Sequence, residues 1–132
     1  MILLRLLLPA LALSGCATYP SEVSDEPPLA YACNQVVVIG RLENGNYEHV
    51  PIENDLLGHG FTTAKLHVQD VRFGRVARRT LRIRYFSHAQ IVEDESIMFV
   101  LDRPEEDGFY RLRSLRMMDG KPQLARSCDA PA

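Results

Sequence analysis

Short runs of hydrophobic residues alternate with polar residues along most of the chain after residue 33. Residues 36–39 form a continuous β-branched run, which is typical of a buried strand, and residues 97–101 form a second apolar run. Apolar and polar residues alternate at 64–68 and at 81–85, which predicts two half-buried strands. The phase of this alternation shifts after Gln69-Asp70, which predicts a β-bulge there.

Glycine, proline and asparagine mark the turns between these runs. Asn44-Gly45 is a strong signal for a two-residue hairpin, and Asp119-Gly120 predicts a second hairpin near the C-terminus. We expect residues 53–60 to form a loop, residues 87–95 to form a loop or a short helix, and residues 123–128 to form the last strand. No long helical period follows the N-terminal segment. Five or six strands and few helices predict an all-β fold, a small barrel or sandwich.

The N-terminal segment differs in character from the rest of the chain. Arg5 is followed by an apolar run to Leu13 and then by small residues, which are the marks of an export signal. The sequence Leu13-Ser14-Gly15-Cys16 resembles a bacterial lipobox, the recognition sequence of lipoprotein signal peptidase. The resemblance implies that residues 1–15 are removed and that Cys16 becomes a lipidated N-terminus. An ordinary secretory signal with an incidental cysteine is the alternative, whereas a membrane helix would need about 20 apolar residues.

Proline, serine and acidic residues are frequent between residues 17 and 32. Such a segment cannot bury enough apolar surface to fold by itself. We therefore expect residues 16–32 to be the lipidated cysteine and a flexible tether. Residues 33–128 are expected to form one domain, followed by a C-terminal tail at 129–132.

Two cysteines, Cys33 and Cys128, remain beside Cys16. Export places the chain in an oxidising compartment, where leftover cysteines usually pair, so we expect a Cys33–Cys128 disulfide. Closing a loop of this length stabilises a fold by up to about 4.7 kcal/mol in the chain-entropy model. In the alternative, both thiols are free or one of them is buried and inert.

The spacing of strands and cysteines carries a further resemblance. The residues concerned are Cys33, Val36 to Arg41, Ala64 to Val68, Gly74, Leu81, Ile83, Met98 to Leu101, Asp107-Gly108 with Tyr110, and Cys128. In spacing and apolar pattern they resemble the netrin-like domains, a group of OB-type barrels that includes the tissue inhibitors of metalloproteinases. The resemblance implies a small OB-like barrel of five or six strands. Those inhibitors present a free N-terminal cysteine amine to the protease zinc, whereas Cys33 lies behind the tether, so no inhibitory activity is carried over.

The charges of the chain are unevenly distributed, although 15 Lys+Arg nearly balance 17 Asp+Glu. Seven basic residues and one acidic residue lie between residues 65 and 84. Guanidinium groups bind phosphate and carboxylate groups bidentately, and such groups belong to lipid headgroups, polyanionic glycans or an acidic partner. In the alternative, acidic residues between 93 and 107 neutralise the arginines in surface ion pairs, which contribute about 0–1 kcal/mol each. The candidate contacts are Arg75, Arg78, Arg79, Arg82 and Arg84.

Residue patterns for catalysis and for cofactor or metal binding are missing from the sequence. There is no Gly-x-Ser-x-Gly, no Ser-x-x-Lys and no glycine-rich phosphate loop, and the four histidines lack the spacing of metal ligands. We therefore expect a protein that is not an enzyme and that uses no cofactor or metal. A cleft with His59 or His88 beside a carboxylate would instead favour a small periplasmic enzyme or enzyme inhibitor.

These observations predict a lipid-anchored, non-enzymatic binding or scaffolding module of the bacterial cell envelope. Ala17 follows the lipidated cysteine, and it is not the aspartate that tends to keep enteric lipoproteins in the inner membrane. This favours the outer membrane, facing the periplasm. The expected partners are the membrane, through the lipid anchor, and an envelope protein or a polyanionic glycan. Export and a net charge of −2 disfavour nucleic acid as a ligand.

Overall fold

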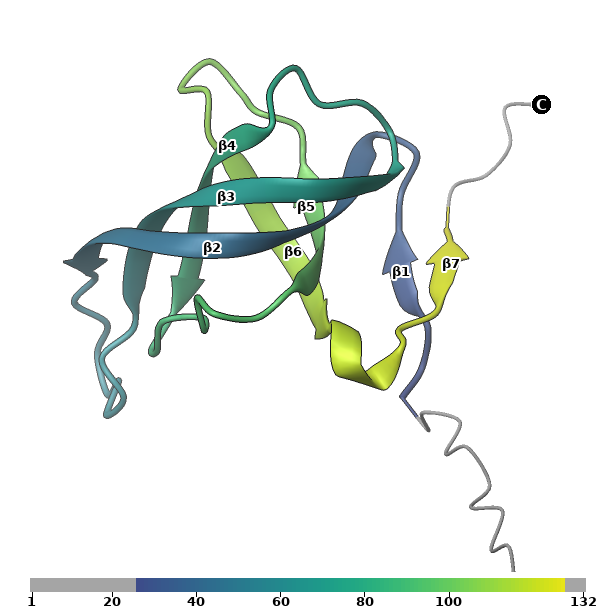
Figure 1. The fold of residues 1–132 in the computed structure, drawn as a ribbon. Helices are drawn as coiled ribbons and strands as arrows, with labels where there is room; N and C mark the ends of the chain where they lie inside the picture. The colour runs from purple at the N-terminus through teal and green to yellow at the C-terminus, as the bar shows by residue number, and fades with distance from the viewer. Residues whose placement is uncertain (1–25, 128–132) are drawn as a thin grey trace, which may run out of the picture.

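The computed structural model describes residues 26–127, and more than half of them lie in seven strands (Figure 1). A short 3₁₀ turn, η1 (Met118–Gly120), follows the sixth strand. Both the lipobox and Cys128 lie outside the described residues. The strands are β1 (Leu29–Tyr31), β2 (Gln35–His49), β3 (Gly60–Phe73), β4 (Thr80–Ser87), β5 (Ile97–Asp102), β6 (Tyr110–Met117) and β7 (Leu124–Arg126).

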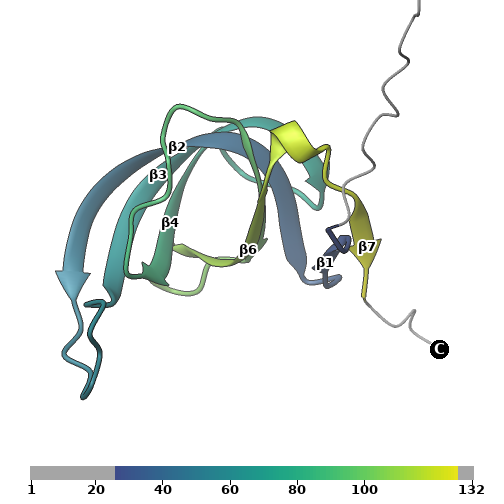
Figure 2. The ribbon, with the colours of Figure 1, turned by 90° about the horizontal axis from the view of Figure 1, so that it is seen from below.

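Five of these strands close into a barrel in the order β2-β3-β4-β6-β5. Strand β2 pairs with both β3 and β5, which closes the barrel. Strands β4 and β6 run parallel, with Ile83 opposite Tyr110, and the other barrel pairs are antiparallel. Figure 2 shows the long strands β2 and β3 curving together over β4 and β6. The predicted all-β fold with a small OB-like barrel is confirmed.

The core has two parts. The barrel interior is filled from all five barrel strands, and Phe99, Leu66 and Ile83 are among its fully buried side chains. A smaller cluster lies outside the barrel, between β2, β5 and the paired strands β1 and β7. It consists of Leu29, Val37, Ile39, Met98 and Val100, with Tyr31, Phe73, Met118 and Leu124 packed against it. Because β2 and β5 are buried on both faces here, residues 36–39 and 97–101 are continuous apolar runs rather than alternating ones.

The bulge predicted at Gln69-Asp70 is confirmed. Ile39 pairs with Asp70 whereas Gly40 pairs with Val68, so that Gln69 is the extra residue of β3. Opposite the bulge the two backbones approach closely, and a Cβ atom on Gly40 would lie 2.5 Å from the carbonyl oxygen of His67. The close approach therefore requires glycine at position 40.

The hairpin predicted at Asn44-Gly45 is wrong. Strand β2 continues through both residues to His49, and the connection to β3 is the loop 50–59. Neither residue has the positive φ that a type I′ turn requires. Instead, the Asn44 amide donates to the carbonyl of Ile91 at 2.7 Å and its oxygen accepts from the Tyr85 hydroxyl at 2.7 Å. These hydrogen bonds hold Asn44 in the barrel wall, and a bulge in β2 absorbs the irregularity.

The hairpin predicted at Asp119-Gly120 is also wrong. These residues belong to η1, and the next residue, Lys121, has a left-handed backbone with a φ of 47°. The final strand, expected over 123–128, is present as β7, but it pairs in parallel with β1 rather than returning along β6. Strand β1 begins at the buried Leu29. The fold therefore includes the last part of the segment expected to be a tether.

Replacing Leu101 tests the assignment of the barrel core. Leu101→Ala is expected to lower the free energy of unfolding by about 2–5 kcal/mol, because it removes a fully buried side chain and leaves a cavity. The matched control is Leu56→Ala, since that leucine is 97% exposed and should change stability by no more than about 0.5 kcal/mol. Urea unfolding followed by circular dichroism measures both. Equal stability of the two variants would contradict the assigned core.

Candidate functional site

The outer surface of strands β3 and β4 carries aromatic and basic side chains in register. Alternation along each strand buries Leu81, Ile83 and Tyr85 in the barrel and leaves the intervening residues on the outside. Three cross-strand pairs line this outer surface, which we call the β3–β4 face. They are Phe61 with Phe86, Thr63 with Arg84, and Lys65 with Arg82. The prediction that Arg82 and Arg84 share one face of a strand is confirmed.

Aromatic rings support both arginines of this face. The guanidinium carbon of Arg82 lies 4.0 Å from the ring centre of Phe109, and that of Arg84 lies 4.2 Å from the ring centre of Phe61. A guanidinium stacked on a ring gains a cation–π attraction of about 0.5–1 kcal/mol at an exposed site. The stacking fixes the plane of the guanidinium group and, at Arg82, leaves its N–H edge free to bind a ligand.

A groove of about 310 Å³ runs beside Arg82 on this face. At its edge Glu43 accepts hydrogen bonds from His67 at 3.0 Å and from Lys65 at 3.2 Å, and these bonds lower the pKa of the Glu43 carboxyl. Lys65 therefore already has a carboxylate partner. Within residues 26–127, no carboxylate lies within ion-pairing distance of Arg82. The groove is lined by Glu43, Asn44, Gly45, Asn46, Thr63, Ala64, Lys65, Arg82 and Phe109.

Arg84 is the neighbour of Arg111 across the parallel pair of β4 and β6. Arg84 lies 3.6 Å from the carboxylate of Glu48, and Arg111 donates to Asp107. The hydrogen bond from Arg111 is the main reason why the pKa of Asp107 is lowered. Even so, the Nε of Arg84 and one Nη of Arg111 are buried without a hydrogen-bond acceptor among the described residues. Because neither of these two nitrogens is accessible to solvent, an external anion could bind them only if the side chains moved.

The other three predicted arginines, Arg75, Arg78 and Arg79, lie in the β3–β4 loop at residues 74–79. All three are exposed and border a second groove of about 380 Å³. The five predicted arginines thus form two groups, one on the β3–β4 face and one in the loop. Among the described residues, no carboxylate between 93 and 107 forms an ion pair with these five arginines, and two of those carboxylates pair elsewhere, Asp102 with Arg113 and Asp107 with Arg111.

Three residues of this site were not predicted from the sequence. They are Arg111 and the aromatic partners of Arg82 and Arg84, which are Phe109 and Phe61. Phe61 could have been found, because it precedes the alternating stretch 64–68 and falls on its polar side. Phe109 gave no local signal. The pairing of β4 with β6 brings it to Arg82, since Phe109 ends the β5–β6 loop just before β6.

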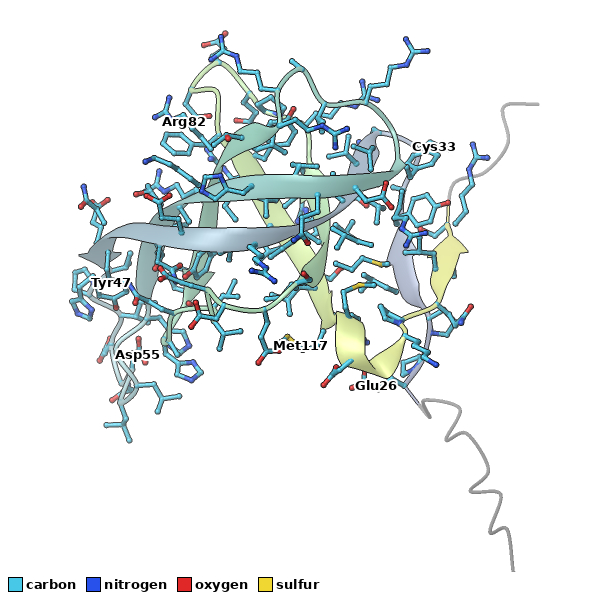
Figure 3. The ribbon with its side chains drawn as sticks, viewed as in Figure 1. Glu26, Cys33, Tyr47, Asp55, Arg82 and Met117 are labelled. Carbon is cyan, nitrogen blue, oxygen red and sulfur yellow. The ribbon has the colours of Figure 1, made fainter. Side chains whose placement is uncertain are left out.

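The loop at residues 50–59 is organised by one carboxylate, that of Asp55 (Figure 3). Asp55 accepts hydrogen bonds from the backbone N–H groups of Leu57, Gly58 and His59 at 3.1, 3.1 and 2.6 Å. The Nδ1 of His59 lies 2.9 Å from the same carboxylate. The hydrogen bonds from the His59 backbone and side chain lower the pKa of Asp55 to about 2.

The loop also brings the two predicted histidines together. The ring centres of His59 and His88 are 5.2 Å apart, and His59 stacks on Phe86 at 5.5 Å. A histidine beside a carboxylate is the feature expected of an enzyme. Here, however, the Asp55 carboxylate also accepts hydrogen bonds from three backbone N–H groups of its own loop. Within residues 26–127, no group of His, Cys, Asp and Glu side chains is suited to hold a metal ion.

Comparisons of the chain with models of protein families, with curated proteins and with solved structures give no match. No helix among residues 26–127 has the length and hydrophobicity to cross a membrane. The arrangement of the described side chains is therefore the main support for a functional interpretation.

Asp55→Asn is expected to lower the melting temperature at neutral pH. An amide has one acceptor oxygen, whereas the loop uses both oxygens of the Asp55 carboxylate. In the native chain the Asp55 pKa falls from 3.8 to about 2, so its stabilisation is complete above 3.8 and is lost as the pH falls toward 2. The difference in melting temperature between the native protein and Asp55→Asn should therefore become smaller as the pH falls from 3.8 to about 2. Thermal unfolding between pH 2 and 7 measures it, with the exposed Glu53→Gln as the control. A difference that is constant with pH would contradict this role.

Proposed function

We propose that this protein is a lipid-anchored, non-enzymatic binding module of the bacterial cell envelope, and that its β3–β4 face binds a polyanionic glycan. The observation that carries the proposal is Arg82, which is stacked on Phe109 beside a groove and has no carboxylate partner among the described residues. A positioned guanidinium without a counter-ion favours an external anion as its partner.

The location of this face within the barrel supports the same proposal. Strands β3 and β4 are the second and third strands of the barrel. In OB-type barrels the face of the corresponding strands, with the loops beside it, binds oligonucleotides and oligosaccharides. This is an analogy between folds, and it carries no weight without the side chains. Here the side chains agree with it, since both basic and aromatic groups lie on this face. An exported protein would not meet oligonucleotides as its usual ligands, so an oligosaccharide is the class of ligand that we propose.

The lipid anchor is proposed from the sequence alone. Leu13-Ser14-Gly15-Cys16 has the form of a lipobox, and a lipid on Cys16 would hold the domain at a membrane. Each buried methylene of an acyl chain contributes about 0.8 kcal/mol, so several chains would anchor a small domain permanently. The residue after the cysteine, Ala17, favours the outer membrane, facing the periplasm.

A disulfide between Cys33 and Cys128 is also proposed, and the register of β1 and β7 supports it. Leu29 lies opposite Leu124 and Tyr31 opposite Arg126, so partners are 95 positions apart. Cys33 and Cys128 are separated by the same 95 positions. Neighbouring strands lie about 4.7–4.9 Å apart, within the range of about 4.4–6.8 Å between the Cα atoms of a disulfide. Arg126 donates to the Cys33 sulfur at 3.1 Å, which brings the end of β7 beside Cys33.

A small periplasmic enzyme is the second candidate function, and the convergence of Asp55, His59 and His88 is the observation that favours it. A general base needs a nucleophile or water within hydrogen-bond reach. Among the described residues, no serine, threonine or cysteine is hydrogen-bonded to either histidine. The binding module is therefore the better interpretation.

The anchor and the disulfide are tested on the mature protein isolated from its membranes without reductant. Its N-terminus is expected to be an acylated Cys16, and its peptide map is expected to contain Cys33 linked to Cys128. Cys16→Ser should abolish acylation and membrane association, and globomycin should cause the precursor to accumulate. Cys33→Ser, the matched control, should keep the lipid but lose about 2–5 kcal/mol of stability. Globomycin-insensitive processing with membrane-bound Cys16→Ser would refute the anchor, and unlinked cysteines would refute the disulfide.

Charge reversal tests the β3–β4 face. Arg82→Glu is expected to weaken binding to immobilised dextran sulfate roughly ten- to a hundredfold, because it removes a charge-assisted contact of about 1.5–3 kcal/mol. Arg72→Glu is the matched control, since it makes the same charge change at an arginine that pairs with Asp70 away from this face. Biosensor binding at physiological salt measures both affinities. Equal weakening by the two variants would show that only net charge matters and would overturn the site.

A further inference from the structure

Exposed apolar side chains gather at one loop of the barrel. Among the described residues six large hydrophobic side chains are exposed, and five of them lie in the loop 50–59 or against it. Leu56 is 97% and Leu57 65% exposed, next to Ile52. Tyr47 donates from its hydroxyl to the Gly58 carbonyl, and Phe86 stacks on His59. Single exposed leucines are ordinary, but a gathering of exposed apolar side chains on one loop marks a candidate interaction site.

The backbone of this loop is held in place although its tip is apolar. The three backbone N–H groups bound by Asp55 lie immediately beyond or within the leucine pair. The loop is closed by hydrogen bonds from Val50 to His59 at 3.0 Å and from Asp55 to Ile52 at 3.1 Å. A tip ordered in advance loses little conformational entropy when it is buried by a partner. The two leucines are therefore held exposed on an ordered loop.

The position of this loop relative to the N-terminal end of the fold indicates what it meets. In Figures 1 and 3 the loop and Glu26, where the described chain begins, lie at the lower end of the barrel on opposite sides of it, and the β3–β4 loop lies at the upper end. Cys16 and Glu26 are ten positions apart in the sequence. A chain of ten residues spans at most about 36 Å, so an anchor at Cys16 would keep this end of the barrel close to the bilayer.

We infer that Ile52, Leu56 and Leu57 form a membrane-docking tip that enters the surface of the bilayer to which the chain is anchored. The inference rests on the proposed lipid anchor. Docking at a second point would fix the orientation of the barrel, with the β3–β4 loop and its arginines directed away from that bilayer. Apolar contact drives the docking, because Glu53 and Asp55 make the loop acidic and give it no attraction for anionic headgroups.

A bilayer suits this tip better than a protein partner does. The two leucines protrude, and neither of them lines the grooves beside the arginines. A protein would need a pocket shaped for the leucine pair, whereas the acyl boundary accepts apolar side chains of any shape. Docking on an envelope protein is the competing outcome of the test below.

Tryptophan fluorescence tests the inference directly, because the chain contains no tryptophan. The lipidated protein carrying Leu56→Trp is reconstituted into phosphatidylcholine vesicles that contain brominated lipid. A tip buried about 5–10 Å into the headgroup and acyl boundary should give blue-shifted emission and several-fold stronger quenching than in bromine-free vesicles. Ala77→Trp, in the exposed β3–β4 loop at the other end, is the matched control and should show neither change.

Two further arms separate the explanations. Adding Leu57→Asp to the Leu56→Trp protein should remove the quenching, whereas adding Val92→Asp, an exposed residue of another loop, should leave it intact. Replacing part of the phosphatidylcholine by phosphatidylglycerol should not increase the quenching. An increase would show that arginines, not the apolar tip, bring the protein to the bilayer, and it would overturn the inference.

Failure of the anchor and failure of the tip are distinguishable. If the native protein does not float with vesicles, the anchor fails. The chain from Ala17 is then given an N-terminal hexahistidine tag and held on vesicles with nickel-chelating lipid, which restores the tether. Quenching of Leu56→Trp on these vesicles would support the docking tip by itself. A tethered protein whose Leu56→Trp emits as in water would overturn the inference and would leave docking on a protein as the explanation.

Discussion

Closure of the barrel depends on the pairing of two strands that are apolar on both faces. Along β2 and β5 the inner side chains fill the barrel, whereas Val37, Ile39, Met98 and Val100 point outward. The outer row would face water without the short strands β1 and β7 and the η1 turn, which cover it with Leu29 and Leu124 among others. The two ends of the described chain, residues 26–127, are therefore part of the fold. This cover also fixes the place where the N-terminal segment leaves the barrel.

The barrel strands could be predicted from sequence because hydrophobic periodicity reports burial directly. The continuous runs at 36–39 and 97–101 and the phase shift at Gln69-Asp70 all have structural counterparts. The hairpin at Asn44-Gly45 could not be judged locally, because Tyr85 and Ile91 hold Asn44 in the barrel wall from more than forty residues away. Strand β1 was missed because its three residues contain too little pattern to recognise, whereas β7 was predicted and only its parallel pairing with β1 was not.

As in the fold, some features of the candidate site follow from neighbouring residues in the sequence, and others depend on residues far away in it. Alternation placed Arg82 and Arg84 on one face, and the loop role of Asp55 is a local turn preference that sequence could have suggested. The stacking of Arg82 on Phe109 depends on barrel closure, which joins the β5–β6 loop to β4. The absence of a carboxylate partner for Arg82 among the described residues could not be predicted from the sequence either. Several acidic residues follow it in sequence, but Asp102 and Asp107 are already held by Arg113 and Arg111.

The two ends of the barrel differ in chemistry, and this difference limits the ligand. One end carries the apolar loop tip and the start of the described chain, and the opposite end carries the exposed Arg75, Arg78 and Arg79 (Figure 1). With the apolar end against the anchoring bilayer, the arginine loop would be a barrel length away from it. Exposed charges act over about 8 Å at physiological salt. The headgroups of that bilayer would then be out of reach of the arginine loop, and an anion would have to approach from the side that faces away from the bilayer.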